Sequence, residues 1–291
     1  MRYAFISEYA HEHSIALMCA LLKVSRSGFY KFRRHIVSAQ ENANVRLLEE
    51  IRTIHQKSRG TYGSPRIHRE LVKNGKACGR HRVARLMAKE GIVGKIRRRF
   101  RTTTRQRQGA VPAPDLVNRT FTAQRPHQVW TSDITYIWTN EGWLYLAVIL
   151  DVFSRAIIGW ATSERIDAQL VCTAFQRALW QYRPGLPVIF HSDRGSQYTS
   201  KMFRAQLAAQ TVPFIQSNGL SCYDNAVTET FFHTLKTESL HFEHFQTRLE
   251  AHQHLFDYIE VFYNQNRLHS SLGYRTPREI LQGINNNQKA A

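Results

Sequence analysis

The sequence predicts an α/β protein. A basic, all-helical region comes first in the chain, and a five-stranded mixed sheet flanked by helices follows it. The first observation is the distribution of charge. Residues 1–121 contain 26 Lys and Arg against 8 Asp and Glu, whereas residues 122–291 contain 14 of each. The second is that the strand-like runs, rich in β-branched and aromatic residues, lie in the neutral part. The excess charge predicts a polyanionic partner, which composition alone leaves open as DNA, RNA or an acidic protein.

The basic part is predicted to contain two helical units. Residues 14–34 form two short helices around a turn, with Ser25 as the N-cap of the second. A helix-turn-helix and a basic helical hairpin that only packs are equally good interpretations of this segment. Three further helices make a second candidate DNA-binding unit. They are expected at about 44–56, from Pro65 after a cap by Ser64, and at 80–89.

A basic arm and a linker follow these helices. Residues 95–107 hold seven Lys and Arg and no acid, so phosphate contacts are their simplest use. The arginines expected to make these contacts are Arg97, Arg98, Arg99, Arg101, Arg105 and Arg107. Residues 108–115 contain two prolines and few apolar side chains, which is typical of a linker between domains.

The neutral part is predicted to alternate between strands and helices. Three successive strands with short polar turns between them favour an antiparallel meander. The strands are expected within 130–138, 143–155, 156–163, 187–193 and 212–217, and the helices at about 168–182, 200–210 and 224–240. This order matches the ribonuclease H-like arrangement. From about Thr247 we expect a long amphipathic helix and then a turn-rich tail.

These segments divide the chain into five parts, whose boundaries follow the changes in charge and in hydrophobic pattern. The parts are an N-terminal basic helical segment (1–41), a helical DNA-binding region with its arm (42–107), a linker (108–121), a catalytic core (122–240) and a C-terminal helical extension (241–291).

Three carboxylates in the neutral part form a candidate metal site. Asp133 lies among strand-forming residues, where an acid is unfavourable unless a partner compensates for it. Asp193 ends an apolar strand, and Glu229 lies in a helix after an interval of 35 residues. Asp133 and Asp193, at the carboxyl ends of adjacent strands, could share a metal that Glu229 reaches from across the cleft. Such oxygen ligands suit Mg²⁺ or Mn²⁺, and two ions would support in-line displacement at phosphorus.

Other residues near these acids have competing interpretations. Lys236 follows Glu229 by two helical turns and is placed to hold a DNA phosphate, although an ordinary solvated lysine is as good an interpretation. Asp151 also ends a strand-like run and is interpreted as structural, with Arg155 as a partner. Asp224 is interpreted as the N-cap of the last core helix. Taken singly, each of the three acids is more often a turn or surface residue than a catalytic one.

Three motifs resemble one known family. They are W-x-x-D-I-T-Y at 130–136, HSDRGSQYTS at 191–200 and CYDNAVTETFFHTLKTE at 222–238, and TYGSPRIHREL upstream is similar to the segment before that family's catalytic core. The chain resembles the second-frame (OrfB) product of insertion sequence three family transposases, in the retroviral-integrase superfamily. This resemblance implies that Asp133, Asp193 and Glu229 are the metal-binding DDE triad. The segment Ser217–Cys222 departs from the family's usual pattern and puts loop contacts there in doubt.

The resulting hypothesis is a DNA transposase that performs metal-dependent 3′-end cleavage and strand transfer. The alternatives are a ribonuclease H-like nuclease that does not join strands and a non-catalytic DNA-binding regulator. The expected partners are double-stranded DNA (element ends and target), further copies of the chain in the DNA complex, and the first-frame (OrfA) product by fusion or association. No apolar run is long enough to span a membrane. The resemblance implies a bacterial cytoplasmic protein associated with the nucleoid.

Overall fold

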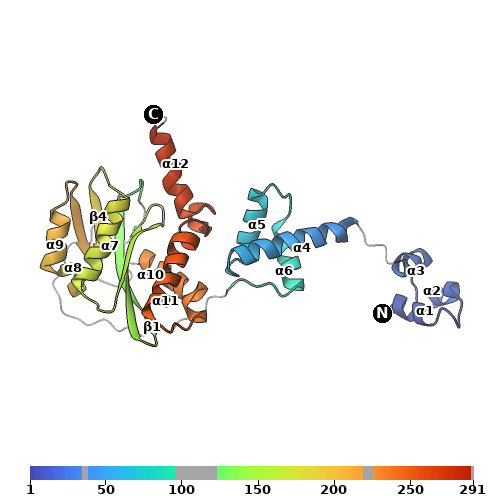
Figure 1. Cartoon of the computed structure of the whole chain (residues 1–291). Helices are drawn as coiled ribbons and strands as arrows, with labels where there is room; N and C mark the ends of the chain where they lie inside the picture. Colours follow the sequence, from blue (N-terminus) through green and yellow to red (C-terminus); the bar gives the residue numbers. More distant parts are fainter. Residues whose placement is uncertain (35–38, 96–122, 219–225, 290–291) are drawn as a thin grey trace.

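The computed structural model describes residues 1–34, 39–95, 123–218 and 226–289. Three parts succeed one another along the chain: a small N-terminal helical bundle, a second helical unit, and an α/β core to which the C-terminal helices belong (Figure 1). Among the described residues, none of the helices is both long and apolar enough to cross a membrane.

The N-terminal bundle contains α1 (Arg2–Glu8), α2 (Ile15–Leu21) and α3 (Arg26–Arg33). Both helices predicted within residues 14–34 are therefore confirmed, whereas α1 was not predicted. Ser25 caps α3 as expected, because its side-chain oxygen accepts a hydrogen bond from the backbone N–H of Gly28 (3.1 Å). The three helices share a small core made by Ile6, Met18, Cys19 and Phe29.

The second helical unit contains α4 (Ala39–Lys57), α5 (Ser64–Lys73) and α6 (Arg80–Lys89). Its core includes Ile51, Ile67, Leu71 and Val83. The predicted cap of α5 is wrong: Gly63 is the N-cap, and no side chain caps the helix. Gly91 follows α6 with φ +64°, a left-handed conformation that glycine adopts without steric cost, so the predicted end of this helix is confirmed.

The core sheet has the predicted five strands in a mixed arrangement. They are β1 (Val129–Thr139), β2 (Gly142–Asp151), β3 (Ile157–Ser163), β4 (Val188–Ser192) and β5 (Phe214–Asn218), in the spatial order β3-β2-β1-β4-β5. β1, β2 and β3 form the expected antiparallel meander, while β4 runs parallel to both β1 and β5. This topology brings β1 and β4 side by side although about 50 residues separate them.

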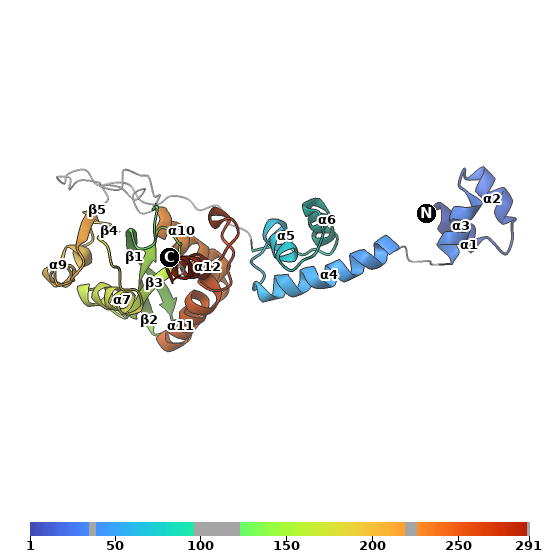
Figure 2. The same cartoon turned by 90° about the horizontal axis from the view of Figure 1, so that it is seen from above.

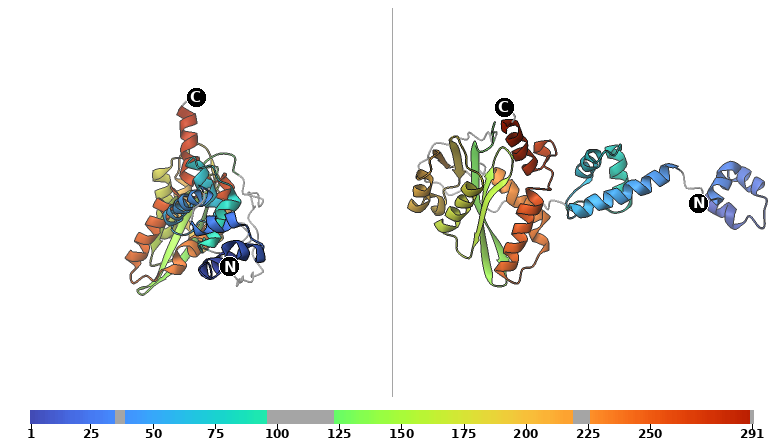
Figure 3. Two further views of the ribbon diagram at one scale, coloured as in Figure 1. Left: turned by 90° about the vertical axis from the view of Figure 1, so that its right-hand side faces the viewer. Right: turned by 45° about the horizontal axis from the view of Figure 1, so that its top comes forward.

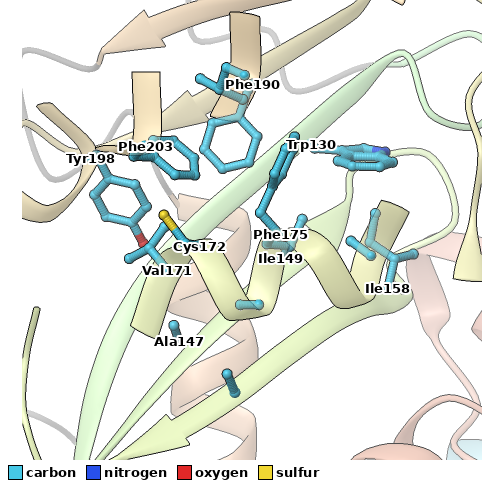
Figure 4. Packing of buried hydrophobic residues seen from close by; sticks show 14 of the residues in the cluster. Trp130, Ala147, Ile149, Ile158, Val171, Cys172, Phe175, Phe190, Tyr198 and Phe203 are labelled. Atoms are coloured by element: carbon cyan, nitrogen blue, oxygen red, sulfur yellow. The ribbon is translucent and has the colours of Figure 1, made fainter. Parts of the chain in front are cut away.

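Helices cover both faces of the sheet. On one face, α7 (Ala168–Gln181) buries Phe175 against Trp130 and Phe190, together with α8 (Ser196–Thr199) and α9 (Lys201–Ala208) (Figure 4). On the other face, α10 (Ala226–Glu238) and α11 (Arg248–Phe256) cover β1 and β2, and α11 continues into a π-helix (Asp257–Tyr263). Alternate residues of β1 therefore point to different helices, and this alternation decides which side chains can meet.

The helical unit α4–α6 lies beside the core, and the C-terminal segment joins the two (Figure 2 and Figure 3). The hydroxyl of Tyr62 donates to the carbonyl oxygen of Asn266 (2.9 Å) and accepts from the backbone N–H of Leu268 (2.7 Å). Arg59 adds an ion pair with Asp257 (2.6 Å). The prediction of a turn-rich tail is wrong at its end, because residues Pro277–Lys289 form a further helix, α12.

Candidate active site

The register between β1 and β4 brings the two predicted aspartates together. The parallel pairing of these strands ends with Ser132 opposite Ser192, and Asp133 and Asp193 are the next residue along each chain. Asp193 follows the end of β4, as predicted. Asp133 instead lies midway along β1, opposite Val148 of β2, so its predicted place at a strand end is corrected. The ladder between β1 and β4 stops at these two carboxylates.

Helix α10 carries Glu229 in its first turn. A buried hydrogen bond between the hydroxyls of Thr228 and Thr131 (2.7 Å) fixes this end of α10 against β1. Thr131 and Asp133 are two residues apart in the same strand, so both point toward the α10 face of the sheet. Glu229 itself is exposed, whereas Val227, Phe231 and Leu235 are buried in the core, as the helical spacing predicted.

Electrostatics show that these groups act on one another. Burial, opposed by a hydrogen bond from the N–H of Ile134, and then the charges of Asp193 and Glu229 raise the pKa of Asp133 from 3.8 to about 7. Although Glu229 is exposed, neighbouring atoms partly desolvate its carboxylate and raise its pKa. Lys236 is the cation that acts on Asp133 in the opposite direction, and burial lowers its own pKa. The predicted triad and Lys236 therefore share one electrostatic site.

The donor chemistry of this site fits a divalent cation, although the distances do not form a closed cage. Within the part of the chain that the structure describes, no three His, Cys, Asp or Glu side chains cluster tightly enough to hold an ion. Asp133, Asp193 and Glu229 supply hard carboxylate oxygens, the type that Mg²⁺ and Mn²⁺ prefer. Burial first, and then the charges of Asp193 and Glu229, raise the pKa of Asp133, and a bound cation would favour its ionised form against both effects.

A buried hydroxyl pair lies behind Asp133, and the sequence pattern did not single it out. Ser132 donates to the carbonyl oxygen of Val148 (2.8 Å), so the hydroxyl of the fully buried Tyr198 must donate to Ser132 (2.9 Å). Burial, and then the charge of Asp133, raise the pKa of Tyr198 well above its usual value, so the phenol stays protonated. Tyr198 belongs to the motif HSDRGSQYTS, which was the available signal.

Asp151 is structural, as interpreted from the sequence. Its buried carboxylate accepts hydrogen bonds from the backbone N–H of His127 (2.9 Å) and from the N–H and hydroxyl of Ser154 (2.9 and 2.6 Å). It pairs across the sheet with Trp130, whose side chain lies in the α7 core, on the face opposite Asp133. The partnership with Arg155 is a backbone hydrogen bond, from the N–H of Arg155 to the carbonyl oxygen of Asp151 (2.8 Å).

Several predicted contacts lie outside the described residues. They are the arm arginines Arg97, Arg98, Arg99, Arg101, Arg105 and Arg107, the cap residue Asp224, and most of the segment Ser217–Cys222. The role of Lys236 in phosphate binding stays a prediction, and its ammonium group lies 5.5 Å from the ring centroid of Tyr136.

Family comparisons agree with this arrangement. Models of an integrase core domain match residues 123–219 and 229–280, and a helix-turn-helix-like domain matches residues 42–100. Transposase InsF for insertion sequence IS3A, from Escherichia coli (strain K12), is 40% identical over 282 residues, covering 96% of this chain and 98% of the relative. The chain belongs to the IS3 family of transposases. The resemblance seen in the sequence motifs is thereby confirmed.

A second relative is the insertion element IS600 uncharacterized 31 kDa protein of Shigella sonnei. It is 42% identical over 260 residues, which cover 89% of this chain and 96% of the relative. The helix-turn-helix-like match of this IS3-family transposase falls on α4–α6, and the interpretation of residues 14–34 as a helix-turn-helix stays a prediction.

Solved structures that match part of this chain include a viral intasome and an integrase catalytic core. A simian T-cell lymphotropic virus intasome gives a TM-score of 0.44 at 16% identity, covering 53% of this chain and 54% of that chain. The HTLV-2 integrase catalytic core in complex with magnesium gives a TM-score of 0.42 at 17% identity, covering 55% of this chain and 99% of that chain. The family assignment of this IS3-family transposase rests on its sequence relatives.

Proposed function

We propose that this transposase cuts and joins DNA strands at Asp133, Asp193 and Glu229. The observation that supports this most directly is the electrostatic coupling of Asp133 to Asp193, Glu229 and Lys236 where the pairing of β1 with β4 ends. In the first step a water oxygen attacks the phosphorus at an element end, and the bond to the 3′-oxygen breaks to release a 3′-hydroxyl. In the second step that hydroxyl loses its proton and attacks a target phosphodiester, whose own 3′-oxygen leaves.

The three carboxylates would hold Mg²⁺ or Mn²⁺, with two ions as the expected number. When bound, these ions activate the attacking oxygen and stabilise the leaving oxygen. Asp133 must be ionised to act as a ligand, and its pKa of about 7 places that change near neutral pH. Lys236, two helical turns beyond Glu229, would hold the scissile strand through a phosphate oxygen, which orients the reacting bond.

The partners of this reaction are also proposed. Double-stranded DNA supplies the element ends and the target, and further copies of the chain join in the DNA complex. The first-frame product, by fusion or association, would recognise the element ends. The relatives come from bacteria, which supports a site of action on the bacterial nucleoid in the cytoplasm.

A cleavage and joining assay tests this function. The full chain, alone and with the first-frame product, is incubated with end-labelled element DNA, target DNA and Mg²⁺. Labelled strands that are shortened at the element end and then lengthened by joining to target DNA support the proposal. Cleaved strands that never join would indicate a nuclease instead. DNA binding without any Mg²⁺-dependent product, even with the first-frame product, would indicate a regulator.

A further inference from the structure

A cavity of about 510 Å³ lies against α10, the helix that carries Glu229. Thr230, at its edge, is about 100° around the helix axis from Glu229, whereas Val227 and Phe231, which also line the cavity, are about 160° around it. The cavity and the carboxylate therefore belong to the same turns of α10 but lie on different sides of the helix. Its polar lining consists chiefly of Arg66, Arg155, Arg267, Thr230, Thr234 and Ser271, which we call the arginine cavity.

The three arginines come from three parts of the fold. Arg66 belongs to α5 of the helical unit, Arg155 to the turn between β2 and β3, and Arg267 to the segment between the π-helix and α12. The cavity thus exists only because the helical unit, the core and the C-terminal segment meet beside α10. A surface position on any single element would not place three guanidinium groups together.

The positive charge in this cavity exceeds the negative charge that offsets it. Glu238 binds Arg267 through two hydrogen bonds (2.8 and 2.7 Å), and its carboxylate lies 3.6 Å from Arg66. Among the described residues, no hydrogen bond or ion pair engages the guanidinium group of Arg155, which is only partly exposed. Among the described residues, Glu238 is therefore the one carboxylate within 4 Å of these three arginines, and the charge of Asp151 acts on Arg155 from further away.

His269, which also lines the cavity, is affected by the same excess of positive charge. Burial, followed by the charges of Arg267, Arg66 and Arg155, lowers the pKa of this histidine to about 2. The imidazole is therefore neutral and leaves the excess charge to the arginines. A partly buried guanidinium without a partner is unfavourable unless an acceptor fills the space in front of it.

Phosphate is the acceptor that fits best. Guanidinium groups present planar forks of N–H donors that match phosphate oxygens, and the hydroxyls of Ser270, Ser271 and Thr230 add further polar groups. An apolar ligand would leave the guanidinium groups without an acceptor, and the positive charge of the cavity disfavours a cation.

We propose that the arginine cavity binds a backbone phosphate of the DNA that passes α10, the helix that carries Glu229. This inference rests on the proposed function, because DNA is its source of phosphate. A phosphate there would contact the helical unit, the core and the C-terminal segment at once. DNA held by α4–α6 would thereby be fixed relative to α10 and to the core sheet.

The salt dependence of DNA binding by the full chain tests this site. Each lost phosphate contact should reduce the slope of log Kobs against log salt by about 0.9. Arg155→Gln should show this reduction and bind DNA about tenfold more weakly at low salt. Arg204→Gln is the matched control, because Arg204 is an exposed arginine on α9 away from the cavity, and it should leave the slope unchanged.

A second pair of variants covers the case in which Arg155→Gln does not fold. Ser271 is exposed at the cavity, so Ser271→Asp adds a carboxylate without disturbing the core, and Ser271→Asn is its neutral counterpart. Ser271→Asp should weaken DNA binding about tenfold, whereas Ser271→Asn should not. An unchanged slope in Arg155→Gln or, where that variant does not fold, equal affinities of the two Ser271 variants would overturn the proposal.

Free phosphate is distinguished in a separate arm. The melting temperature of the full chain is measured with inorganic phosphate against chloride at equal ionic strength. Stabilisation by phosphate that disappears in Arg155→Gln, together with an unchanged DNA slope, would assign the cavity to free phosphate and refute the DNA proposal. Failure of the wild-type chain to bind DNA would instead count against the proposed function, so the two failures are distinct.

Discussion

Replacing Glu238 by glutamine should destabilise the protein strongly. Glu238 and Arg267 are 8% and 6% exposed, and the carboxylate accepts hydrogen bonds from Arg267 and from the hydroxyl of Tyr258 (3.1 Å). Burial disfavours the charged form of Arg267. The hydrogen bonds and the charge of Glu238 outweigh this effect, so the pKa of Arg267 is raised. Glu238→Gln keeps the shape but leaves the arginine uncompensated, which costs about 3–5 kcal/mol in free energy of unfolding.

Equilibrium unfolding in urea measures this loss. The matched control is Glu164→Gln, which breaks the exposed ion pair with Arg248 (3.1 Å) and should cost less than about 1 kcal/mol. The double variant Glu238→Gln/Arg267→Met should lose less free energy of unfolding than the two single variants lose together, because neither partner of the buried pair is then left charged without the other. If Glu238→Gln lost no more stability than Glu164→Gln, the buried pair would not be holding α10 to the C-terminal segment.

Two further predictions concern the core. Because the pKa of Asp133 is raised from 3.8 to about 7, the metal-free native state keeps a proton that the unfolded chain has lost, so stability should fall as pH rises from about 4 to about 7. Urea unfolding across this range should show the decline in the wild type and a smaller one in Asp133→Asn; equal declines would contradict the shift. A Cβ added at Gly159 would lie 2.5 Å from the carbonyl oxygen of Ala174, so Gly159→Ala should cost about 1–3 kcal/mol. Gly185→Ala, where a Cβ would meet nothing within 4 Å, is its control, and equal melting temperatures would refute the packing argument.

The strands were predictable because short β-branched and aromatic runs alternate with polar turns, a signal that each segment carries by itself. The proximity of Asp133 and Asp193 has a different origin. It depends on the parallel pairing of β1 with β4, which no local pattern encodes; the order of strands and helices and the family resemblance pointed to it, but not to the register.

The helix α12 shows a signal that was present but outweighed. Thr276 and Glu279 form a capping box, in which Glu279 accepts from the backbone N–H of Thr276 (2.8 Å) and Thr276 accepts from that of Glu279 (3.2 Å). The glycine and asparagines that follow have low helix propensity, which opposes this signal. The arginine cavity had no local signal, because Arg66 and Arg267 are brought together only by tertiary packing.

Strand joining by the carboxylate variants tests the central claim most directly. Asp193→Asn and Glu229→Gln are compared with wild type and with Glu164→Gln, which removes an exposed acid outside the site. The assay contains the first-frame product, labelled 3′-hydroxyl ends and Mg²⁺, and DNA affinity is measured in parallel. We predict that both site variants bind DNA but form no joined product, while Glu164→Gln joins strands like wild type. Joining at the wild-type rate by either site variant would contradict the assignment.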